Sequence, residues 1–197
     1  MIVVMMAPAT ATLAQRVGFR TLAPNAITLT RQGSTDLEFD DLLLDSDMVS
    51  AIALSDINRL VVLAVDAPAH YDLIIHIGKK YNDKLLLNGT ETDQWIPFTL
   101  EFAFANQGYP TTETYFRALP DAVTIPPGRG HITFPISRRA SPLPPSPVKQ
   151  GKHKGYEQRA FLFFYGSLGS ANAGKNVVAG SYETTIEVTI DFASHEH

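Results

Sequence analysis

The chain has 197 residues, of which 45% are hydrophobic and 18% are charged, and its formal net charge is −4. This composition excludes a chain that is disordered throughout, and the negative charge gives no general attraction to nucleic acid or to an anionic membrane. The absence of cysteine excludes disulfides, thiolate metal sites and cysteine nucleophiles. Thirteen Gly and thirteen Pro favour many short strands joined by turns, within one domain.

Residues 1–14 have the composition of the back half of a secretory signal. An apolar run from Ile2 to Met6 is followed by small residues that offer cleavage after Ala11 or Ala14. No basic segment precedes the apolar run, so a retained strand stays open as the alternative. A cleaved signal implies that the protein passes through the periplasm and is secreted or held at the cell surface.

Residues 15–25 are predicted to form an N-terminal arm ahead of the main domain. Val17, Phe19 and Thr21 share one parity, and in a strand they would therefore lie on one side. This arm could insert as an extra strand into the sheet of a neighbouring molecule, or it could pair with its own sheet. The pattern leaves both alternatives open.

Residues 26–192 are predicted to form one antiparallel β-sandwich domain. Apolar runs cover 49–54, 60–65 and 71–77 and are separated by turn residues, which is typical of sandwiches, and Asn88-Gly89 is a turn pair. Residues 160–165 are apolar on both parities, as expected of a central strand covered on both faces. We expect one helical turn around 114–119, and helix in less than about a fifth of the chain.

The last long strand is predicted from Gly180 to Phe192, and 193–197 form a C-terminal tail. Its residues alternate with a period of two, so one face is apolar and the other is polar and acidic. The apolar parity holds Tyr182, Thr184, Ile186, Val188, Ile190 and Phe192.

The sequence predicts no catalytic, cofactor or metal site, and we expect no enzyme. The acidic residues from Asp36 to Asp47 lack the spacing of a calcium loop, and strand alternation explains the first of them as a solvated edge. His195 and His197 are a pair at a chain end, where a metal site is not expected. Ser167 lies in no nucleophile motif and is interpreted as a turn residue.

Residues 138–159 are predicted to form a long exposed loop, because they are rich in proline and have no apolar periodicity. The segment carries a net charge of +5, which leaves −9 on the remainder of the chain. It could contact the acidic strand face of another molecule or an anionic polysaccharide, or it could be a solvated tether. Its basic residues are Arg138, Arg139, Lys149, Lys152, Lys154 and Arg159.

Two motifs near the end of the chain carry a family resemblance. Phe163-Phe164-Tyr165-Gly166 is followed by a loop, by Val178-Ala179-Gly180-Ser181-Tyr182 and by the alternating strand. This order is similar to the close of spore-coat-U-like proteins and archaic chaperone-usher pilin subunits. Asp36-Leu37-Glu38-Phe39 resembles an element of related small secreted bacterial proteins.

The resemblance implies an immunoglobulin-like sandwich that lacks a strand and is completed by the N-terminal strand of a neighbouring subunit. On this reading Val17, Phe19 and Thr21 belong to the donated arm, and the acceptor groove lies along the last strand at Tyr182, Ile186, Val188 and Ile190. The implied function is a structural subunit of a filament, pilus or extracellular matrix. The implied partners are copies of itself or related subunits, a periplasmic chaperone and an usher. A monomeric carbohydrate-binding or adhesin domain is the alternative.

Overall fold

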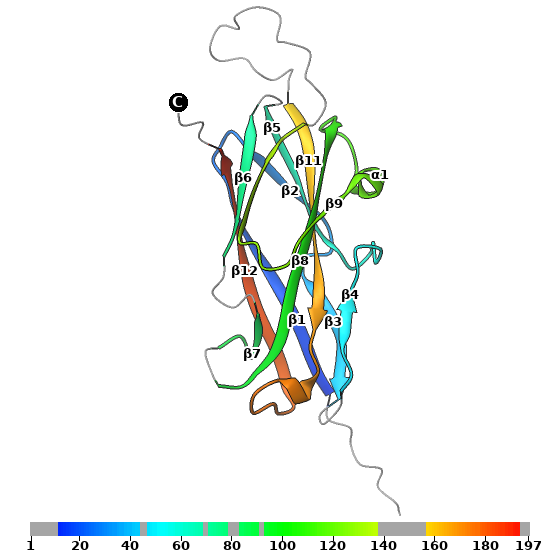
Figure 1. Ribbon diagram of the computed structural model, residues 1–197, viewed down its shortest axis with the longest axis vertical. Coiled ribbons are helices and arrows are strands. Elements are labelled where there is room, and N and C mark those ends of the chain that lie inside the picture. The colour runs from blue at the N-terminus through cyan, green and yellow to red at the C-terminus, as the bar shows by residue number, and fades with distance from the viewer. Residues whose placement is uncertain are drawn as a thin grey trace, which may run out of the picture.

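The computed structural model describes residues 12–43, 47–68, 71–78, 83–90, 93–137 and 157–193. Strands hold 61% of these described residues and helices 7%, which confirms the all-β prediction and the low helix content. The short helix α1 (Tyr115–Ala118) forms the helical turn expected around 114–119, and it lies at the side of the molecule in Figure 1. No helix in these ranges is long and apolar enough to span a membrane.

Twelve strands form one continuous sheet that curls on itself. Its first half is built around β12, which pairs with β1 along one edge and with β6 and β7 along the other. Beyond these, β3 pairs with β1, and β10 pairs with β6. The bounds of these strands are β1 (Thr12–Leu22), β3 (Leu37–Leu43), β6 (Asp72–Ile77), β7 (Lys84–Leu87), β10 (His131–Pro135) and β12 (Gly180–Phe192).

The second half of the sheet is built around β11, which pairs with β8 on one edge and with β5 and β4 on the other. Beyond these, β2 pairs with β5, and β9 pairs with β8. β8 joins the two halves because its first residues also pair with β7. The bounds are β2 (Thr28–Gly33), β4 (Ser50–Ile52), β5 (Val61–Pro68), β8 (Trp95–Tyr109), β9 (Val123–Ile125) and β11 (Glu157–Leu168).

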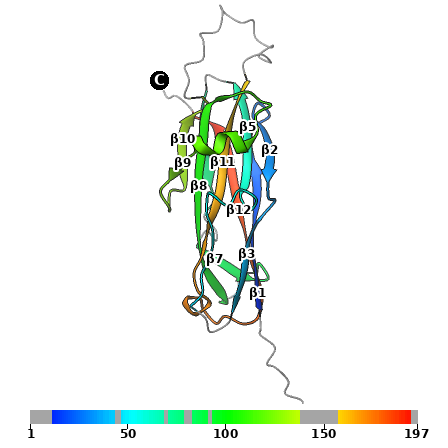
Figure 2. The ribbon, with the colours of Figure 1, turned by 90° about the vertical axis from the view of Figure 1, so that its right-hand side faces the viewer.

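The two halves of the sheet pack face to face. Phe104 of β8 stacks on Phe134 of β10 with the ring centroids 4.5 Å apart, and Phe39 of β3 meets Phe98 of β8 at 5.9 Å. The core therefore lies between the halves, and the long strands β8, β11 and β12 run along the long axis of the molecule (Figures 1 and 2).

Local alternation places the side chains of the long strands as the sequence predicts. Along β12 every second residue from Tyr182 to Ile190 is buried, while Thr185, Glu187 and Asp191 are exposed. Residues 160–165 of β11 are all buried, because this strand is paired on both edges and packed on both faces. Asn88 and Gly89 form the expected turn with positive φ values of 53° and 64°.

Four predictions need correction. The sheet is not wholly antiparallel, because β1 runs parallel to β12. The sheet also includes β1 from Thr12 onward, whereas the sandwich was predicted to begin at residue 26. Residues 157–159 belong to β11, so the predicted exposed loop ends too late. Arg159 is buried because Asp66 lies beside it in register on β5 and binds it. Ser167 also belongs to β11, where it pairs with Ala51, and not to a turn.

Candidate functional site

β1 comes first in the described chain, yet it lies inside the sheet. It pairs in parallel with β12 from Leu13 to Leu22 and antiparallel with β3 from Thr12 to Val17. Its first half therefore has a strand on each side, whereas Gly18 to Leu22 pairs with β12 alone among the described strands. We call the space that β1 fills in the sheet, between β12 and β3, the β1 slot.

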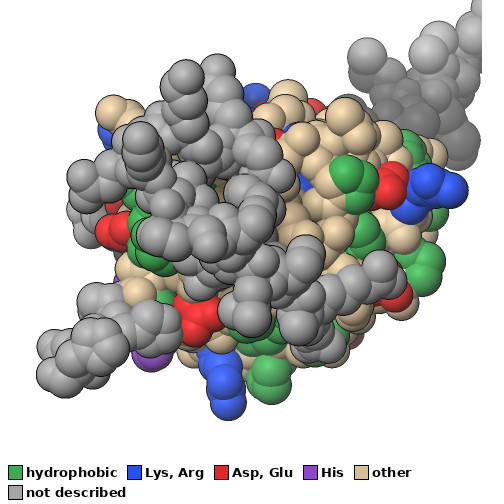
Figure 3. All heavy atoms as spheres, turned by 90° about the horizontal axis from the view of Figure 1, so that it is seen from above, with side chains coloured by type: hydrophobic (Ala, Val, Ile, Leu, Met, Phe, Trp, Pro, Cys, Tyr) green, Lys and Arg blue, Asp and Glu red, His purple; other side chains and the backbone are tan. Residues whose placement is uncertain are grey.

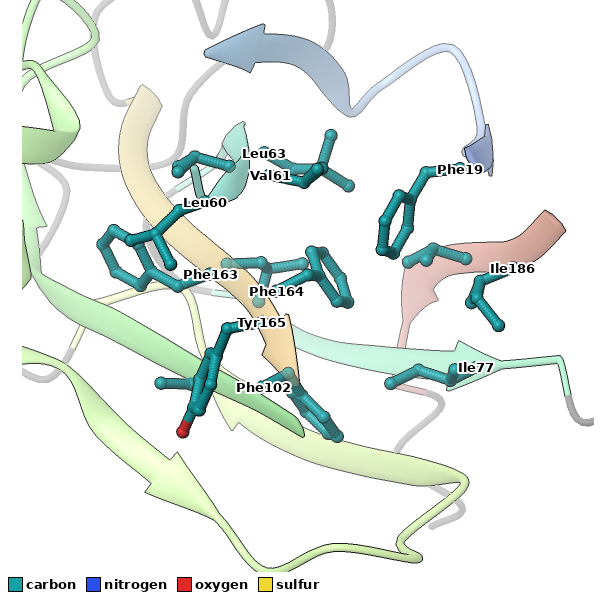
Figure 4. Packing of buried hydrophobic residues seen from close by; sticks show 14 of the residues in the cluster. Phe19, Leu60, Val61, Leu63, Ile77, Phe102, Phe163, Phe164, Tyr165 and Ile186 are labelled. Atoms are coloured by element: carbon teal, nitrogen blue, oxygen red, sulfur yellow. The ribbon is translucent and has the colours of Figure 1, made fainter. Parts of the chain in front are cut away.

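The inward side of β1 is apolar and contributes to the core. Val17 is fully buried and Phe19 is 8% exposed, while Thr21 is half-buried. Figure 4 shows the Phe19 ring pointing from β1 toward Phe164, and the centroids of the two rings lie 5.0 Å apart. Burying side chains of this kind stabilises a fold by about 1.5–3 kcal/mol each, so β1 is integral to the core.

The residues that the resemblance assigns to an acceptor groove lie on β12, beside β1. Phe19 lies beside Ile186 in the parallel register, and Thr21 lies beside Val188. Tyr182 and Ile190 are fully buried on the same inward face of β12. The structure thus brings the predicted arm and the predicted groove together within one chain.

Ion pairs on the outer surface also attach β1. Arg16 Nη2 lies 3.2 Å from the Glu183 carboxylate on β12, and Arg16 Nη1 lies 3.8 Å from Asp36 ahead of β3. Because the Arg16 side chain is 54% exposed, water and salt screen these pairs. Such pairs contribute about 0–1 kcal/mol each, so they add little to the stability of the β1 pairing.

Arg31 of β2 closes the part of β1 that has no β3 partner. Its Nη2 donates a hydrogen bond of 2.8 Å to the backbone carbonyl of Phe19, and its Nη1 donates one of 3.2 Å to the carbonyl of Thr35. The guanidinium thus takes the place of a strand neighbour at the edge of β1. Sequence reasoning missed this role, because no local pattern relates Arg31 to a backbone atom of another strand.

Two buried polar side chains interrupt the apolar interior of the β1 slot. Gln15 of β1 is 3% exposed and Thr184 of β12 is 6% exposed. No described residue forms a hydrogen bond with the side-chain amide of Gln15 or with the hydroxyl of Thr184. An unsatisfied buried polar group costs about 1–3 kcal/mol. Alternation could have located Gln15, since it shares the parity of Val17 and Phe19.

The connection that follows β1 is short and exposed. Leu22 is 42% exposed, and Ala23 to Ala26 are exposed as well. The backbone N–H of Ile27 donates to the carbonyl of Pro24 at 2.9 Å, which forms a turn directly before β2. The connection between β1 and β2 therefore lies at the surface, while β1 itself remains bonded to β3 and to Arg31 of β2.

The acidic residues near β3 are engaged by arginine. Arg59 donates from Nη2 to the Glu38 carbonyl at 2.8 Å and lies 3.3 Å from the Asp40 carboxylate, on the wall of a surface hollow of about 590 Å³. Within the described ranges, no three His, Cys, Asp or Glu residues are arranged to hold a metal ion. The end view of Figure 3 shows acidic, basic and apolar side chains interspersed on the coloured surface.

A second hollow, of about 530 Å³, lies on the outer face of β6, β10 and β12. The His76 and His131 rings lie 6.0 Å apart on this face. The rings of Tyr71 and Phe192, 4.7 Å apart at the end of the strands, share the parity of the inward residues Leu73 and Ile190. Aromatic, carboxylate and hydroxyl groups therefore meet on this face, with Asp191 and Thr189 among the lining residues.

The basic residues predicted to bind a partner, Arg138, Arg139, Lys149, Lys152 and Lys154, lie outside the described residues, as do His195 and His197. No protein-family model matches the chain, and no curated protein matches it either. The candidate site therefore rests on the geometry of the β1 slot.

Proposed function

We propose that this protein is a non-enzymatic structural subunit that assembles by passing β1 from one copy to the β1 slot of another. The observation that carries the proposal is the seating of β1, which buries Val17 and Phe19 beside β12 and is joined to β2 by an exposed connection. An immunoglobulin-like sandwich that receives one strand from a neighbour would also consist of two packed sheets completed by an N-terminal strand.

The physical basis of exchange is that the β1 slot cannot distinguish its own β1 from that of an identical copy. The same backbone ladder and the same apolar contacts form in both cases, so the difference in free energy is limited to the connection and to the cost of association. Exchange in one direction around an open series of copies produces a filament, whereas reciprocal exchange between two copies closes a dimer.

In this proposal the protein is secreted or held at the cell surface, after passage through the periplasm. Cleavage of a signal after Ala11 would leave β1 whole, because the strand begins at Thr12. Cleavage after Ala14 would shorten the strand at its β3-paired end. The proposed partners are copies of this chain or related subunits, with a chaperone that covers the slot before assembly and an usher that guides assembly.

A second candidate function is a monomeric carbohydrate-binding or adhesin domain. It is favoured by the outer hollow on β6, β10 and β12, where the His76 ring lies among the lining residues with the Asp191 carboxylate and the Thr189 hydroxyl. Small-molecule ligands commonly bind in hollows of about 300–1,000 Å³ that combine aromatic side chains with a few polar groups. This function would not need β1 to leave its own sheet.

Cysteine trapping tests the exchange directly, because the natural chain contains no cysteine. Arg20 and Glu187 are exposed register partners on β1 and β12. One chain carries Arg20→Cys and the other carries Glu187→Cys, and the two are mixed under assembly conditions and oxidised. Exchange predicts a disulfide between the two different chains, since neighbouring strands bring the Cα atoms within disulfide range.

A chain that carries both substitutions reports the seating of β1 within one molecule. The matched control combines Arg20→Cys in one chain with Thr133→Cys in the other. Thr133 is also exposed, but it lies on β10, and β6 separates β10 from β12. Intermolecular disulfide no more abundant than in this control would refute the exchange function. Electron microscopy of the same samples distinguishes filaments from closed dimers, and deletion of residues 15–22 should abolish both.

A further inference from the structure

We infer that Gln15 and Thr184 determine which strand the β1 slot prefers, and that it binds a partner strand with an apolar residue at the Gln15 position more tightly than its own β1. The inference rests on the proposed exchange of β1 and adds the chemistry of the strand that fits best. Such a partner is a related subunit whose N-terminal strand repeats the Val17 and Phe19 pattern without the buried amide.

The described neighbours of Gln15 form no hydrogen bond with its side-chain amide. In register, Gln15 lies between Phe39 of β3 and Tyr182 of β12. Phe39 is an aromatic hydrocarbon side chain, and the Tyr182 hydroxyl is engaged, since it donates to the carbonyl of Val178 and accepts from the N–H of the same residue, both at 3.0 Å. Neither of these two register partners forms a hydrogen bond with the amide.

Thr184 lies diagonally across from Gln15 on the same inward face. Its register partner is Val17, the next inward residue along β1, and none of the described residues bonds to its hydroxyl. The two polar groups are thus neighbours in the interior without forming a hydrogen bond. Farther along the inward side of β1, Phe19 and Thr21 lie beside the apolar residues Ile186 and Val188.

Methionine at the Gln15 position would keep the unbranched shape of the side chain and remove both unsatisfied polar atoms. The backbone ladder with β12 and β3 would not change. Removing an unsatisfied buried amide should tighten binding to the slot by roughly 5- to 150-fold. Because identical copies all carry Gln15, exchange among them gains nothing from this effect, whereas a related subunit with an apolar residue would be selected.

The test uses the full chain with its own β1 in place. Biotinylated peptides of residues 12–22, with the natural sequence or with Gln15→Met, compete for the slot, and capture of the protein gives the half-saturating concentration of each. We expect the Gln15→Met peptide to need a concentration at least about fivefold lower. The reciprocal measurement uses a full chain with Gln15→Met, which should resist the natural peptide by a similar factor.

Two control peptides bracket the effect. A Phe19→Asp peptide should not be captured, because it would bury an unpaired charge, and an Arg20→Gln peptide should behave like the natural one, because Arg20 is exposed. Equal half-saturation by the natural and Gln15→Met peptides would overturn the inference and leave the exchange function standing. Capture of neither peptide would overturn the exchange function and the inference with it.

Discussion

The Arg159–Asp66 pair allows a sharp test of the fold, because it is a charge pair buried between two central strands. Arg159 Nε and Nη2 donate to the two carboxylate oxygens of Asp66, each at 2.7 Å, and Nη1 donates to the carbonyl of Glu113 at 2.8 Å. The side chains of Arg159 and Asp66 are 10% and 9% exposed. Substituting Asp66→Asn keeps the shape of the side chain and leaves the guanidinium charge buried without its counter-ion.

The expected loss of stability follows from the burial of the Arg159–Asp66 pair. Removing one partner of a buried ion pair costs about 3–5 kcal/mol, since the remaining charge is uncompensated. Total stabilities of domains are about 5–15 kcal/mol, so the loss is a large fraction of the whole. With a shift of about 2–4 °C per kcal/mol at this chain length, the melting temperature should fall by roughly 6–20 °C.

The assay is thermal and urea unfolding of the natural chain and its variants. Asp40→Asn is the matched control, because Asp40 pairs with Arg59 at 3.3 Å but its side chain is 74% exposed, and such pairs contribute about 0–1 kcal/mol. Replacing both partners, with Asp66→Leu and Arg159→Met, should recover most of the lost stability, since no charge is then left buried.

Two results would refute the reasoning. Equal losses for Asp66→Asn and Asp40→Asn would mean that Arg159 is solvated and does not depend on Asp66. A double variant less stable than Asp66→Asn would mean that the Arg159 side chain contributes mainly through its bond to Glu113 and not through the ion pair.

Three further predictions concern single positions. Val188→Asp buries an unpaired carboxylate and should abolish folding, whereas Glu187→Gln on the exposed parity should change the melting temperature little; equal effects would contradict the parity of β12. Burial raises the pKa of the Tyr165 hydroxyl above its ordinary value of 10.0, so the neutral form is favoured in the fold. The stability that comes from keeping the Tyr165 hydroxyl neutral is present below about pH 10 and is lost as the pH rises further. Between pH 8 and pH 11, the melting temperature of Tyr165→Phe should therefore fall less than that of the natural chain. Gly166→Ala should destabilise the fold by about 1–3 kcal/mol in urea unfolding, because its Cβ would collide with the backbone carbonyl of Thr99, and an unchanged midpoint would exclude that contact.

Features that depend on neighbouring residues along the chain can be predicted from the sequence. The period of two in β12 predicted which of its side chains are buried, from Tyr182 to Ile190, and the unbroken apolar run of β11 predicted a strand covered on both faces. The parity of Val17 and Phe19 likewise indicated the inward side of β1. These predictions succeed because successive side chains of a strand point to opposite faces wherever the strand lies in the sheet.

Which strands pair with each other cannot be predicted from local patterns and depends on how the whole chain packs. The sequence assigns Arg159 to an exposed basic segment, because no local pattern relates it to its partner Asp66, 93 residues away. The same holds for the parallel pairing of β1 with β12, for the bond from Arg31 to Phe19, and for the enclosure of Gln15 beside Thr184. Strand partners and register are set by the packing of the whole sheet, and a single-residue shift would turn every side chain to the other face.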